Sequence, residues 1–351
     1  MKAAVYRGKD DLRLEEIPVP EPGSGEMLVR VDACGICPTD LKKIEKGVLP
    51  GPRVFGHEIA GTVARLGPGA RGFQEGQRVV VHHHIPCREC FYCRRKVYAQ
   101  CPRYKQNGTT AGFEAAGGGY AEYVKAFDWI VNEGTIPIPD GVRPEEAVFV
   151  EPVNTCLKAV LKAGVSRGET ALVVGQGPIG LLLMQLIRWS GASVFVSDLL
   201  EERRALSLSL GATEAKDAGA DVAAETRGLT DGRGVDTAFV AAVEPVPLAQ
   251  ALAATRPGGR IMSFAATSPG ESVGVDLGLM TLSEKDLLTS YSASVDVQDQ
   301  AAQLVFGREI RVQELVSHRF PFERAKEAFD LAFHPGPGTF KVVVQREPGR
   351  R

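Results

Sequence analysis

The sequence predicts an α/β protein of two domains, in which a mostly-β region precedes a doubly wound parallel sheet. Three observations support this prediction. Residues 1–152 contain short apolar or alternating runs separated by glycine and proline clusters, which is the pattern of strands and turns. From residue 153 onward, strand and helix patterns alternate, which is typical of βαβ units. The length of 351 residues also fits two domains better than one or three.

Composition excludes several classes of protein. Hydrophobic residues make up 44% and charged residues 24% of the chain, as expected for a globular protein with a buried core. The formal net charge of -2 gives no reason to expect a nucleic acid or an anionic membrane as a partner. Seven cysteines are too few for a disulfide scaffold. We therefore expect a small-molecule partner.

Targeting and membrane segments are not expected either. Residues 1–10 reach charge before an apolar segment can form, so they do not resemble a signal peptide. The longest apolar stretch, residues 171–187, is interrupted by Gln176, Pro178 and Gln185, which is typical of a buried strand and helix. We expect a cytoplasmic protein, because clustered cysteines in a reducing compartment bind metal more often than they pair.

The expected elements follow from these patterns in chain order. In the first region, the predicted strands are 3–6, 27–33, 59–66, 78–82 and 121–124. In the second region, the predicted strands are 170–175, 193–198, 235–242 and 260–265, and the predicted helices are 178–190, 201–210 and 246–255. Two helices at 298–306 and 323–333 and a strand at 340–345 complete the chain.

A glycine-rich turn joins the first strand and helix of the second region. Its first glycine allows a tight turn, its second lets the backbone approach a pyrophosphate, and its third lets the helix pack on the strand. The start of the helix supplies N–H groups and a partial positive charge to the phosphates. The residues of this predicted dinucleotide site are Gly175, Gly177, Pro178, Ile179 and Gly180.

An acid ends the next predicted strand. Asp198 stands where a carboxylate can accept hydrogen bonds from both ribose hydroxyls, and it would repel a 2′-phosphate. NAD is therefore favoured over NADP. An alternative role for Asp198 is the N-cap of the following helix. Arg203 and Arg204 lie nearby and could accept a phosphate, and we count Arg203 among the cofactor-binding residues.

Four closely spaced cysteines are the strongest indication of a metal site. Two-residue spacers let successive thiolates converge on one tetrahedral Zn²⁺, and the longer last spacer lets the fourth complete the site. Four protein ligands leave no open position, so this zinc would be structural; an iron–sulfur cluster is the competing interpretation. The cysteines lie in a lobe of about residues 86–102 and are Cys87, Cys90, Cys93 and Cys101.

Three more metal-type residues lie outside this lobe. Taken alone, Cys37, His57 and Glu151 are a small buried residue, a core histidine and an acid at a helix start. Together they offer a thiolate, an imidazole and a carboxylate. This set suits Zn²⁺ with one position left for substrate or water.

The order of these motifs resembles that of a known family. Cys34-Gly-Ile-Cys37-Pro-Thr39-Asp40, Gly-His57-Glu58, the four-cysteine lobe, Glu151-Pro and the glycine-rich turn follow one another as in the zinc-dependent medium-chain alcohol dehydrogenases. The resemblance is strongest to the sorbitol (polyol) and threonine dehydrogenase branch. It implies a GroES-like catalytic domain at 1–152 and 290–351, a Rossmann NAD-binding domain at 153–289, and a homo-oligomer, either a dimer or a tetramer.

The resemblance also implies roles for single residues. The implied ligands of a catalytic zinc are Cys37, His57, Glu58 and Glu151. Glu58 is similar to a glutamate that exchanges with water or Glu151 at the metal. Asp40 would orient a ligand, and Thr39 would contact the substrate oxygen and begin the proton path. Each chain would then hold two zinc ions, one catalytic and one structural.

Some positions depart from the family pattern. Lys42 stands where many relatives carry a histidine that ends the proton path. The Arg–Tyr pair associated with polyol binding in sorbitol dehydrogenases is not evident near Tyr291. His84 is similar to a histidine of threonine dehydrogenases that could contact the substrate, although a solvated strand end is the expected place for most of the run 82–84.

These observations predict an enzyme that transfers a hydride reversibly from a secondary alcohol to NAD. The expected substrate is a polyol, a sugar derivative or a β-hydroxy amino acid, with a ketone or aldehyde as the partner in reverse. The alternatives are an L-threonine 3-dehydrogenase activity and a catalytically inactive NAD-binding structural protein. Inactive relatives usually lack the Cys/His/Glu set, which is intact here.

Overall fold

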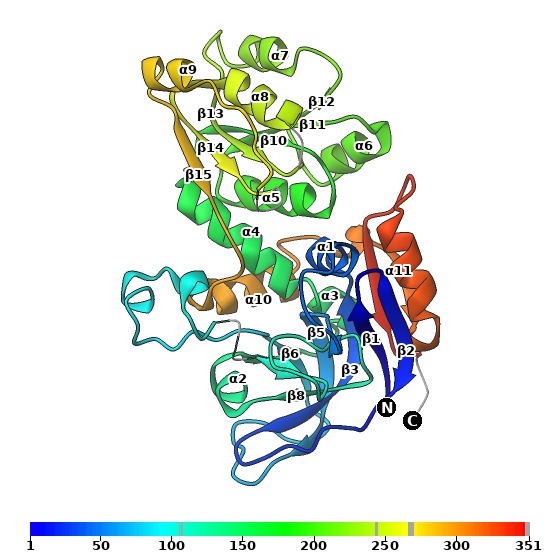
Figure 1. Ribbon diagram of the computed structural model, residues 1–351. Coiled ribbons are helices and arrows are strands. Elements are labelled where there is room, and N and C mark those ends of the chain that lie inside the picture. Colours follow the sequence, from blue (N-terminus) through cyan, green and yellow to red (C-terminus); the bar gives the residue numbers. More distant parts are fainter. Residues whose placement is uncertain (105, 107, 243–244, 266–269, 348–351) are drawn as a thin grey trace. The chain divides into compact units, whose positions relative to one another are not determined.

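The computed structural model describes residues 1–104, 106, 108–242, 245–265 and 270–347. The chain forms two compact units (Figure 1). The first unit comprises Met1–Asn154, Ser294–Arg308 and the chain from Val312 onward, and the second comprises Thr155–Ala293 and Glu309–Arg311. The predicted boundaries lay after residues 152 and 289.

The first unit consists mainly of antiparallel strands. Its larger sheet has the order β16-β17-β3-β5-β6-β9, and β8 pairs with β3 and with β7. These strands are β3 (Met27–Gly35), β5 (Glu58–Leu66), β6 (Arg78–Val81), β7 (Thr109–Thr110), β8 (Tyr123–Ala126), β9 (Thr135–Pro137), β16 (Val316–Pro321) and β17 (Lys341–Gln345). Because β17 pairs with β3, the two ends of the chain build one sheet.

A smaller sheet and several helices complete this unit. The sheet has the order β2-β1-β4. Its strands are β1 (Lys2–Gly8), β2 (Asp11–Glu16) and β4 (Arg53–Val54). The helices are α1 (Pro38–Lys46), α2 (Asp128–Glu133), α3 (Pro144–Ala147), α10 (Gln298–Phe306) and α11 (Ala325–Phe333), and α4 (Val150–Ala163) begins here and continues into the second unit.

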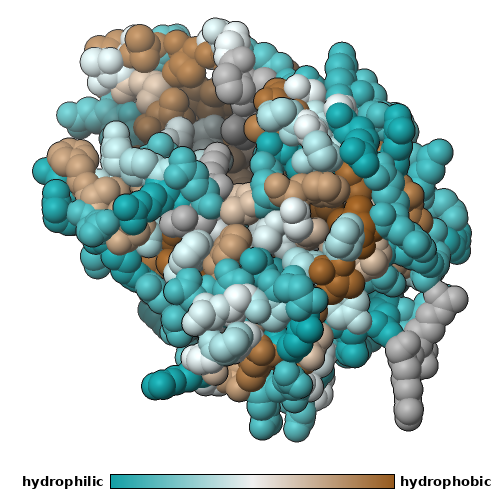
Figure 2. Space-filling model, turned by 60° about the horizontal axis from the view of Figure 1, so that its bottom comes forward, coloured by the Kyte–Doolittle hydropathy of each residue, from teal (hydrophilic) through white to brown (hydrophobic). Residues whose placement is uncertain are grey.

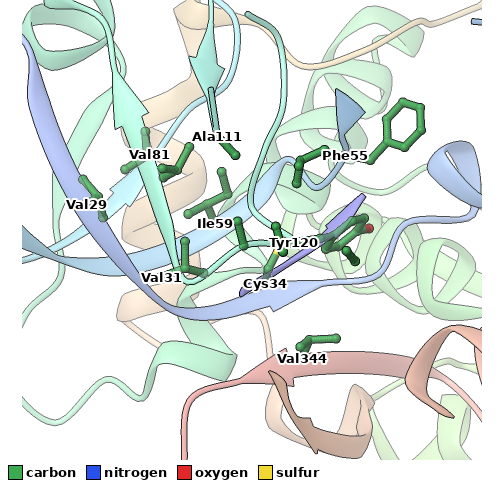
Figure 3. Packing of buried hydrophobic residues seen from close by; sticks show 14 of the residues in the cluster. Val29, Val31, Cys34, Phe55, Ile59, Val81, Ala111, Tyr120 and Val344 are labelled. Atoms are coloured by element: carbon green, nitrogen blue, oxygen red, sulfur yellow. The ribbon is translucent and has the colours of Figure 1, made fainter. Parts of the chain in front are cut away.

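Alternating apolar side chains of the large sheet form the core of the first unit (Figure 3). Val29 and Val31 on β3 and Ile59 on β5 are at most 1% exposed. Val344 brings β17 into the same cluster, and the ring of Tyr120 also packs in it. Burial of this apolar surface holds the β3–β5 pair in one register, since a shift by one residue would turn these side chains out of the core.

The second unit contains a six-stranded parallel sheet in the order β12-β11-β10-β13-β14-β15. Its strands are β10 (Thr170–Val174), β11 (Ser193–Asp198), β12 (Glu214–Asp217), β13 (Val235–Val240), β14 (Thr255–Ser263) and β15 (Asp286–Thr289). Its helices are α5 (Pro178–Trp189), α6 (Glu201–Ser209), α7 (Val222–Gly228), α8 (Pro245–Ala254) and α9 (Leu277–Leu282). This is the strand order of a doubly wound dinucleotide-binding sheet, and the predicted fold class is confirmed.

Some elements differ from the prediction. The strand β12 has the polar sequence Glu-Ala-Lys-Asp and, among the described strands, pairs with β11 alone, so it lacks the apolar pattern that marks a buried strand. The strand β14 begins at Thr255 rather than at residue 260, because a register shift carries pairing past Pro257 and two glycines. Among the described residues, no helix has the length and apolarity needed to cross a membrane.

The glycines of the turn between β10 and α5 have different structural roles. Gly175 has a φ of 91°, in the left-handed region that favours glycine. A Cβ placed on Gly180 would lie 1.9 Å from the carbonyl oxygen of Gly175, whereas a Cβ on Gly177 would meet no atom within 4 Å. Gly180 is therefore needed for packing, and Gly177 is free for approach of a ligand.

We predict that Gly180→Ala destabilises the protein and that Gly177→Ala does not. The new methyl group at position 180 must displace backbone, which costs about 1–3 kcal/mol of unfolding free energy. Gly177 is the N-cap of α5, where alanine costs at most about 1 kcal/mol. Urea unfolding of both variants measures this difference, and a loss in Gly180→Ala no larger than the small loss expected for Gly177→Ala would contradict the prediction.

Candidate active site

Cys37, His57 and Glu58 come together at one end of the β3–β5 pair. Cys37 follows β3 and is the N-cap of α1, His57 precedes β5, and Glu58 is the first residue of β5. One ligand atom from each of the three lies within 4.8 Å of the others. Gly35 pairs with Glu58 across the strands, and a Cβ on Gly35 would lie 1.9 Å from a carboxylate oxygen of Glu58. The absence of a side chain at position 35 thus makes room for the Glu58 carboxylate.

The Asp40 carboxylate fixes the orientation of His57. It is 1% exposed, and its Oδ2 lies 3.0 Å from Nδ1 of His57. The same oxygen accepts a hydrogen bond from the backbone N–H of Gly56 at 3.2 Å, and Lys43 Nζ lies 3.4 Å from Oδ1. Because Nδ1 faces Asp40, Nε2 is the nitrogen of His57 that is available to a metal. The contacts of Asp40 therefore hold the His57 ring in one orientation.

Charge sets the protonation of this pair. Burial alone would raise the pKa of Asp40, but the adjacent His57 and Lys43 and the Gly56 N–H hold the pKa of its carboxyl well below the ordinary value. Burial alone would lower the pKa of His57, but the charges of Asp40 and Cys37 raise the pKa of its ring well above the ordinary value. Asp40 is therefore an anion, and it stabilises a positive charge on the His57 ring or next to it.

Tyr120 is a buried hydroxyl that the sequence did not mark as functional. It is fully buried, and its Oη accepts a hydrogen bond from the backbone N–H of Cys37 at 3.2 Å. The hydroxyl hydrogen can be donated to Asp40 Oδ2 at 3.2 Å or to the Gly35 carbonyl at 3.3 Å. Burial, together with nearby Asp40, Cys34 and other acidic groups, raises the pKa of Tyr120 well above its ordinary value, so it stays a neutral donor. The only signal in the sequence is its position after three glycines.

Lys341 is the second residue that sequence reasoning missed. It begins β17, is 5% exposed, and places Nζ 2.7 and 2.8 Å from the two carboxylate oxygens of Glu58. Burial would lower the pKa of Lys341, but Glu58, Cys37 and Glu151 raise it above its ordinary value. A lysine at the head of an apolar strand, Lys-Val-Val-Val, is the signal that could have found it, because an unpaired charge there would be costly.

Glu151 does not share the close grouping of the other predicted ligands. It lies in the first turn of α4, and its charge raises the pKa of Lys341, so it is part of the same electrostatic environment. Among the described residues, however, the group within 4.8 Å contains Cys37, His57 and Glu58 and no oxygen of Glu151. Thr39 and Lys42 lie on α1 and are exposed.

The donor set fits a zinc ion. It offers one sulfur, one nitrogen and one carboxylate oxygen, and fewer than four protein ligands leave a position for a further oxygen. Cys37 as a thiolate, Glu58 and Asp40 would bring three negative charges, against which Lys341 and Lys43 bring two positive ones. The remaining net charge of about -1 at this buried position favours a bound cation.

The four cysteines of the lobe form a second donor group. The Cys90 and Cys93 sulfurs are 3.5 Å apart, and those of Cys87 and Cys93 are 3.9 Å apart. A tetrahedral zinc with bonds of about 2.3 Å requires sulfurs about 3.8 Å apart. The backbone N–H groups of Glu89 and Cys90 lower the pKa of Cys87 to about 7, which favours a thiolate. All seven cysteines of the chain are free of disulfides.

The histidine run is buried, which corrects the expected solvated strand end. His82, His83 and His84 follow β6 and are 4%, 4% and 8% exposed. The ring centroids of His57 and His83 are 4.8 Å apart, so the run lies beside the metal-type residues. The prediction was wrong because it was based on the polarity of three consecutive imidazoles, whereas in the structure these side chains are buried.

The cofactor turn and Asp198 meet in the second unit. The Asp198 Oδ2 accepts a 2.6 Å hydrogen bond from the backbone N–H of Gln176, inside the glycine-rich turn, and Oδ1 accepts one from Leu200 N–H at 2.9 Å. The N-cap of α6 is Leu200, so the alternative role of Asp198 as N-cap is wrong. Arg203 Nη1 lies 3.7 Å from Asp198 Oδ2. Asp198 therefore ties the end of β11 to the predicted phosphate-binding turn.

Comparison with known proteins agrees with both parts of the chain. Residues 23–140 match the model of the alcohol dehydrogenase GroES-like domain, and residues 178–306 match that of the zinc-binding dehydrogenases. The chain is 32% identical to the L-threonine 3-dehydrogenase of Pyrococcus abyssi over 91% of each chain, and 30% identical to the sorbitol dehydrogenase of Bombyx mori over 94% of each. A structure from Sinorhizobium meliloti 1021, described as a zinc-binding dehydrogenase bound to NADP, superimposes with a TM-score of 0.88 at 28% identity and 98% coverage of both chains.

We predict that elemental analysis of the purified protein finds about two zinc ions per chain. Cys37→Ser should lose one ion with little change in thermal stability, because the apolar core of the first unit is intact. Cys93→Ser should lose the other and lower the melting temperature, because the buried core of the lobe consists only of Cys93, Tyr98, Cys101 and Tyr104 among the described residues. One zinc in the unaltered protein would remove one of the two sites, and iron with sulfide would overturn the zinc assignment of the lobe.

Proposed function

This chain belongs to the zinc-dependent medium-chain alcohol dehydrogenase family, and we propose that it transfers a hydride reversibly between a secondary alcohol and NAD. The observation that carries this proposal is the convergence of Cys37, His57 and Glu58 within 4.8 Å. A catalytically inactive relative would not need this set. Without a metal, three ligand-type side chains beside a buried lysine lower the stability of the fold. We propose a polyol, a sugar derivative or a β-hydroxy amino acid as the substrate.

The proposed chemistry divides between the metal and the side chains. Zinc held by Cys37, His57 and Glu58 supplies Lewis acidity, which lowers the pKa of an alcohol toward neutrality. Asp40 keeps His57 in one tautomer and orientation. The Thr39 hydroxyl, in the first turn of α1, takes the alcohol proton and passes it toward solvent, to which Thr39 and Lys42 are exposed.

Lys341 determines how Glu58 takes part. Both oxygens of Glu58 accept hydrogen bonds from Lys341 Nζ, so a metal held by Glu58 would share the carboxylate with this lysine. Glu151 is then the family's third position, which exchanges with Glu58 or water. The attraction between Glu151 and Lys341 is consistent with a carboxylate close to this exchange.

For the cofactor we propose NAD bound at Gly175, Gly177, Pro178, Ile179 and Gly180. Asp198 is anchored by the N–H of Gln176, which places its negative charge at the turn. A 2′-phosphate would be repelled there, although Arg203 provides some compensation and a solved relative binds NADP.

We further propose a cytoplasmic homo-oligomer, a dimer or a tetramer. Seven free thiols fit a reducing compartment. Figure 2 shows one face of the protein, on which hydrophobic areas interrupt a mostly hydrophilic surface. In the described part of the chain, β15 ends its sheet, and Leu277, Leu279 and Leu282 on the neighbouring α9 are 72%, 46% and 90% exposed. Exposed leucines beside a sheet edge favour contact with a second copy.

An L-threonine 3-dehydrogenase activity is the second candidate. It is favoured by the 32% identity to the Pyrococcus abyssi enzyme and by the burial of His84. A buried imidazole close to the metal-type residues could meet a substrate carboxylate. The sorbitol dehydrogenase of Bombyx mori is similar to the chain over slightly more of its length, so identity alone does not choose between the two.

We predict that a substrate panel detects NAD-dependent oxidation of a secondary alcohol. Polyols, sugars, simple secondary alcohols and L-threonine are tested with NAD, and NADH absorbance is followed. Cys37→Ser should abolish turnover, because the thiolate ligand is lost. If zinc-loaded protein binds NAD but oxidises nothing in the panel, the inactive structural alternative replaces the proposed function.

We predict that Asp198→Ala narrows the preference for NAD over NADP. Loss of the carboxylate removes ribose hydrogen bonds and the repulsion of a 2′-phosphate, so the ratio of kcat/KM values should fall about tenfold or more. Asp198→Asn serves as a control that keeps an acceptor for the Gln176 N–H. An unchanged ratio in the alanine variant would exclude the ribose role of Asp198.

A further inference from the structure

His83 is a buried polar side chain that the proposed chemistry leaves unused. It is 4% exposed, and among the described residues its Nδ1 has no hydrogen-bond partner. A buried polar atom without a partner typically costs about 1–3 kcal/mol. A partner outside the folded chain, such as a bound water, an ion or a ligand, can provide the missing hydrogen bond.

The ring of His83 lies directly against the predicted metal site. Its centroid is 4.8 Å from that of His57 and 3.9 Å from that of His84. His84 in turn stacks on Tyr104 at 4.6 Å with nearly parallel rings, which fixes that side of the cluster. His82 contacts His83 at 5.3 Å, and no ring contact joins His82 to His57 in the described part of the chain. His83 is thus the member of the run that adjoins a metal ligand.

The imidazole of His83 has two ring nitrogens, of which Nδ1 is the one without a hydrogen-bond partner among the described residues. A neutral imidazole has one N–H donor and one acceptor nitrogen. A hydroxyl group matches either nitrogen, because it can both donate and accept.

We propose that His83 is a specificity-determining residue whose Nδ1 hydrogen-bonds a second hydroxyl of the substrate, on the carbon next to the reacting one. We place this hydroxyl on the neighbouring carbon because His83 contacts the ring of His57, so only one side chain separates His83 from the proposed position of the metal. This inference rests on the proposed function and narrows its substrate class to vicinal diols. Simple secondary alcohols leave Nδ1 unpaired and gain no such hydrogen bond, so the site favours diols over them.

The test compares two alcohols that differ by one hydroxyl. With NAD and the zinc-loaded protein, kcat/KM is measured for 2,3-butanediol and for 2-butanol. His83→Phe should lower kcat/KM for the diol about tenfold or more and change that for the mono-alcohol no more than about threefold. His82→Phe is the matched control, since it removes a buried imidazole that does not adjoin His57, and it should leave the ratio unchanged. Equal losses on both alcohols in His83→Phe would overturn the proposal.

A stability measurement separates recognition from a structural role. Because the unpaired nitrogen costs stability, His83→Phe should keep or raise the urea midpoint of unfolding while it loses the diol preference. A lowered midpoint together with an unchanged diol ratio would make His83 a structural residue. His83→Leu gives the same comparison if the phenylalanine variant does not fold.

A binding measurement keeps this proposal separate from the proposed function. If the unaltered protein oxidises neither alcohol, the proposed function fails on these substrates, and thermal shifts with NADH still test His83. In that assay 2,3-butanediol should raise the melting temperature more than 2-butanol does, and His83→Phe should remove the difference. Equal shifts in the unaltered protein would overturn the role of His83.

Discussion

The buried carboxylate of Asp40 is the interaction on which the arrangement of the site depends. It touches His57, the Gly56 N–H, Tyr120 and Lys43, so it links the start of α1 to the residues before β5. The Tyr120 hydroxyl in turn accepts a hydrogen bond from the backbone N–H of Cys37. One carboxylate therefore positions the His57 imidazole directly and the Cys37 backbone through the Tyr120 hydroxyl. Replacement of its charge would free the His57 ring to rotate and leave several polar groups unpaired in the core.

The second organising feature is the ion pair that brings the far end of the chain to this site. Lys341 and Glu58 are 283 positions apart, and β17 joins β3 to bring them together. A buried pair of this kind adds little net stability, because desolvation offsets the attraction. Its value is positional: it holds a carboxylate within reach of Cys37 and His57. The GroES-like unit therefore contains both ends of the chain, and most of the dinucleotide-binding unit comes from the residues between them in the sequence.

Local patterns were sufficient to predict much of the fold and the donor set. The strands and helices around the glycine-rich turn have strong periodicity, and β11 and α10 have the predicted bounds. Cys37, His57 and the four cysteines were marked by spacing and residue type. Lys341, Tyr120 and the burial of His83 were not predictable in the same way, because each depends on contacts between distant segments. The polar edge strand β12 was not predicted for a related reason: in the described part of the chain, it is a strand because it pairs with β11.

The central claim is that two zinc ions occupy two chemically different donor sets in this chain. Anomalous scattering at the zinc edge from crystals of the purified protein tests it most directly. Two peaks are predicted, one surrounded by Cys87, Cys90, Cys93 and Cys101, and one contacted by Cys37 and His57 with Glu58 or Glu151 beside it. A single peak at the four cysteines, with an empty position between Cys37 and His57 in protein that is active on alcohols, would contradict the account.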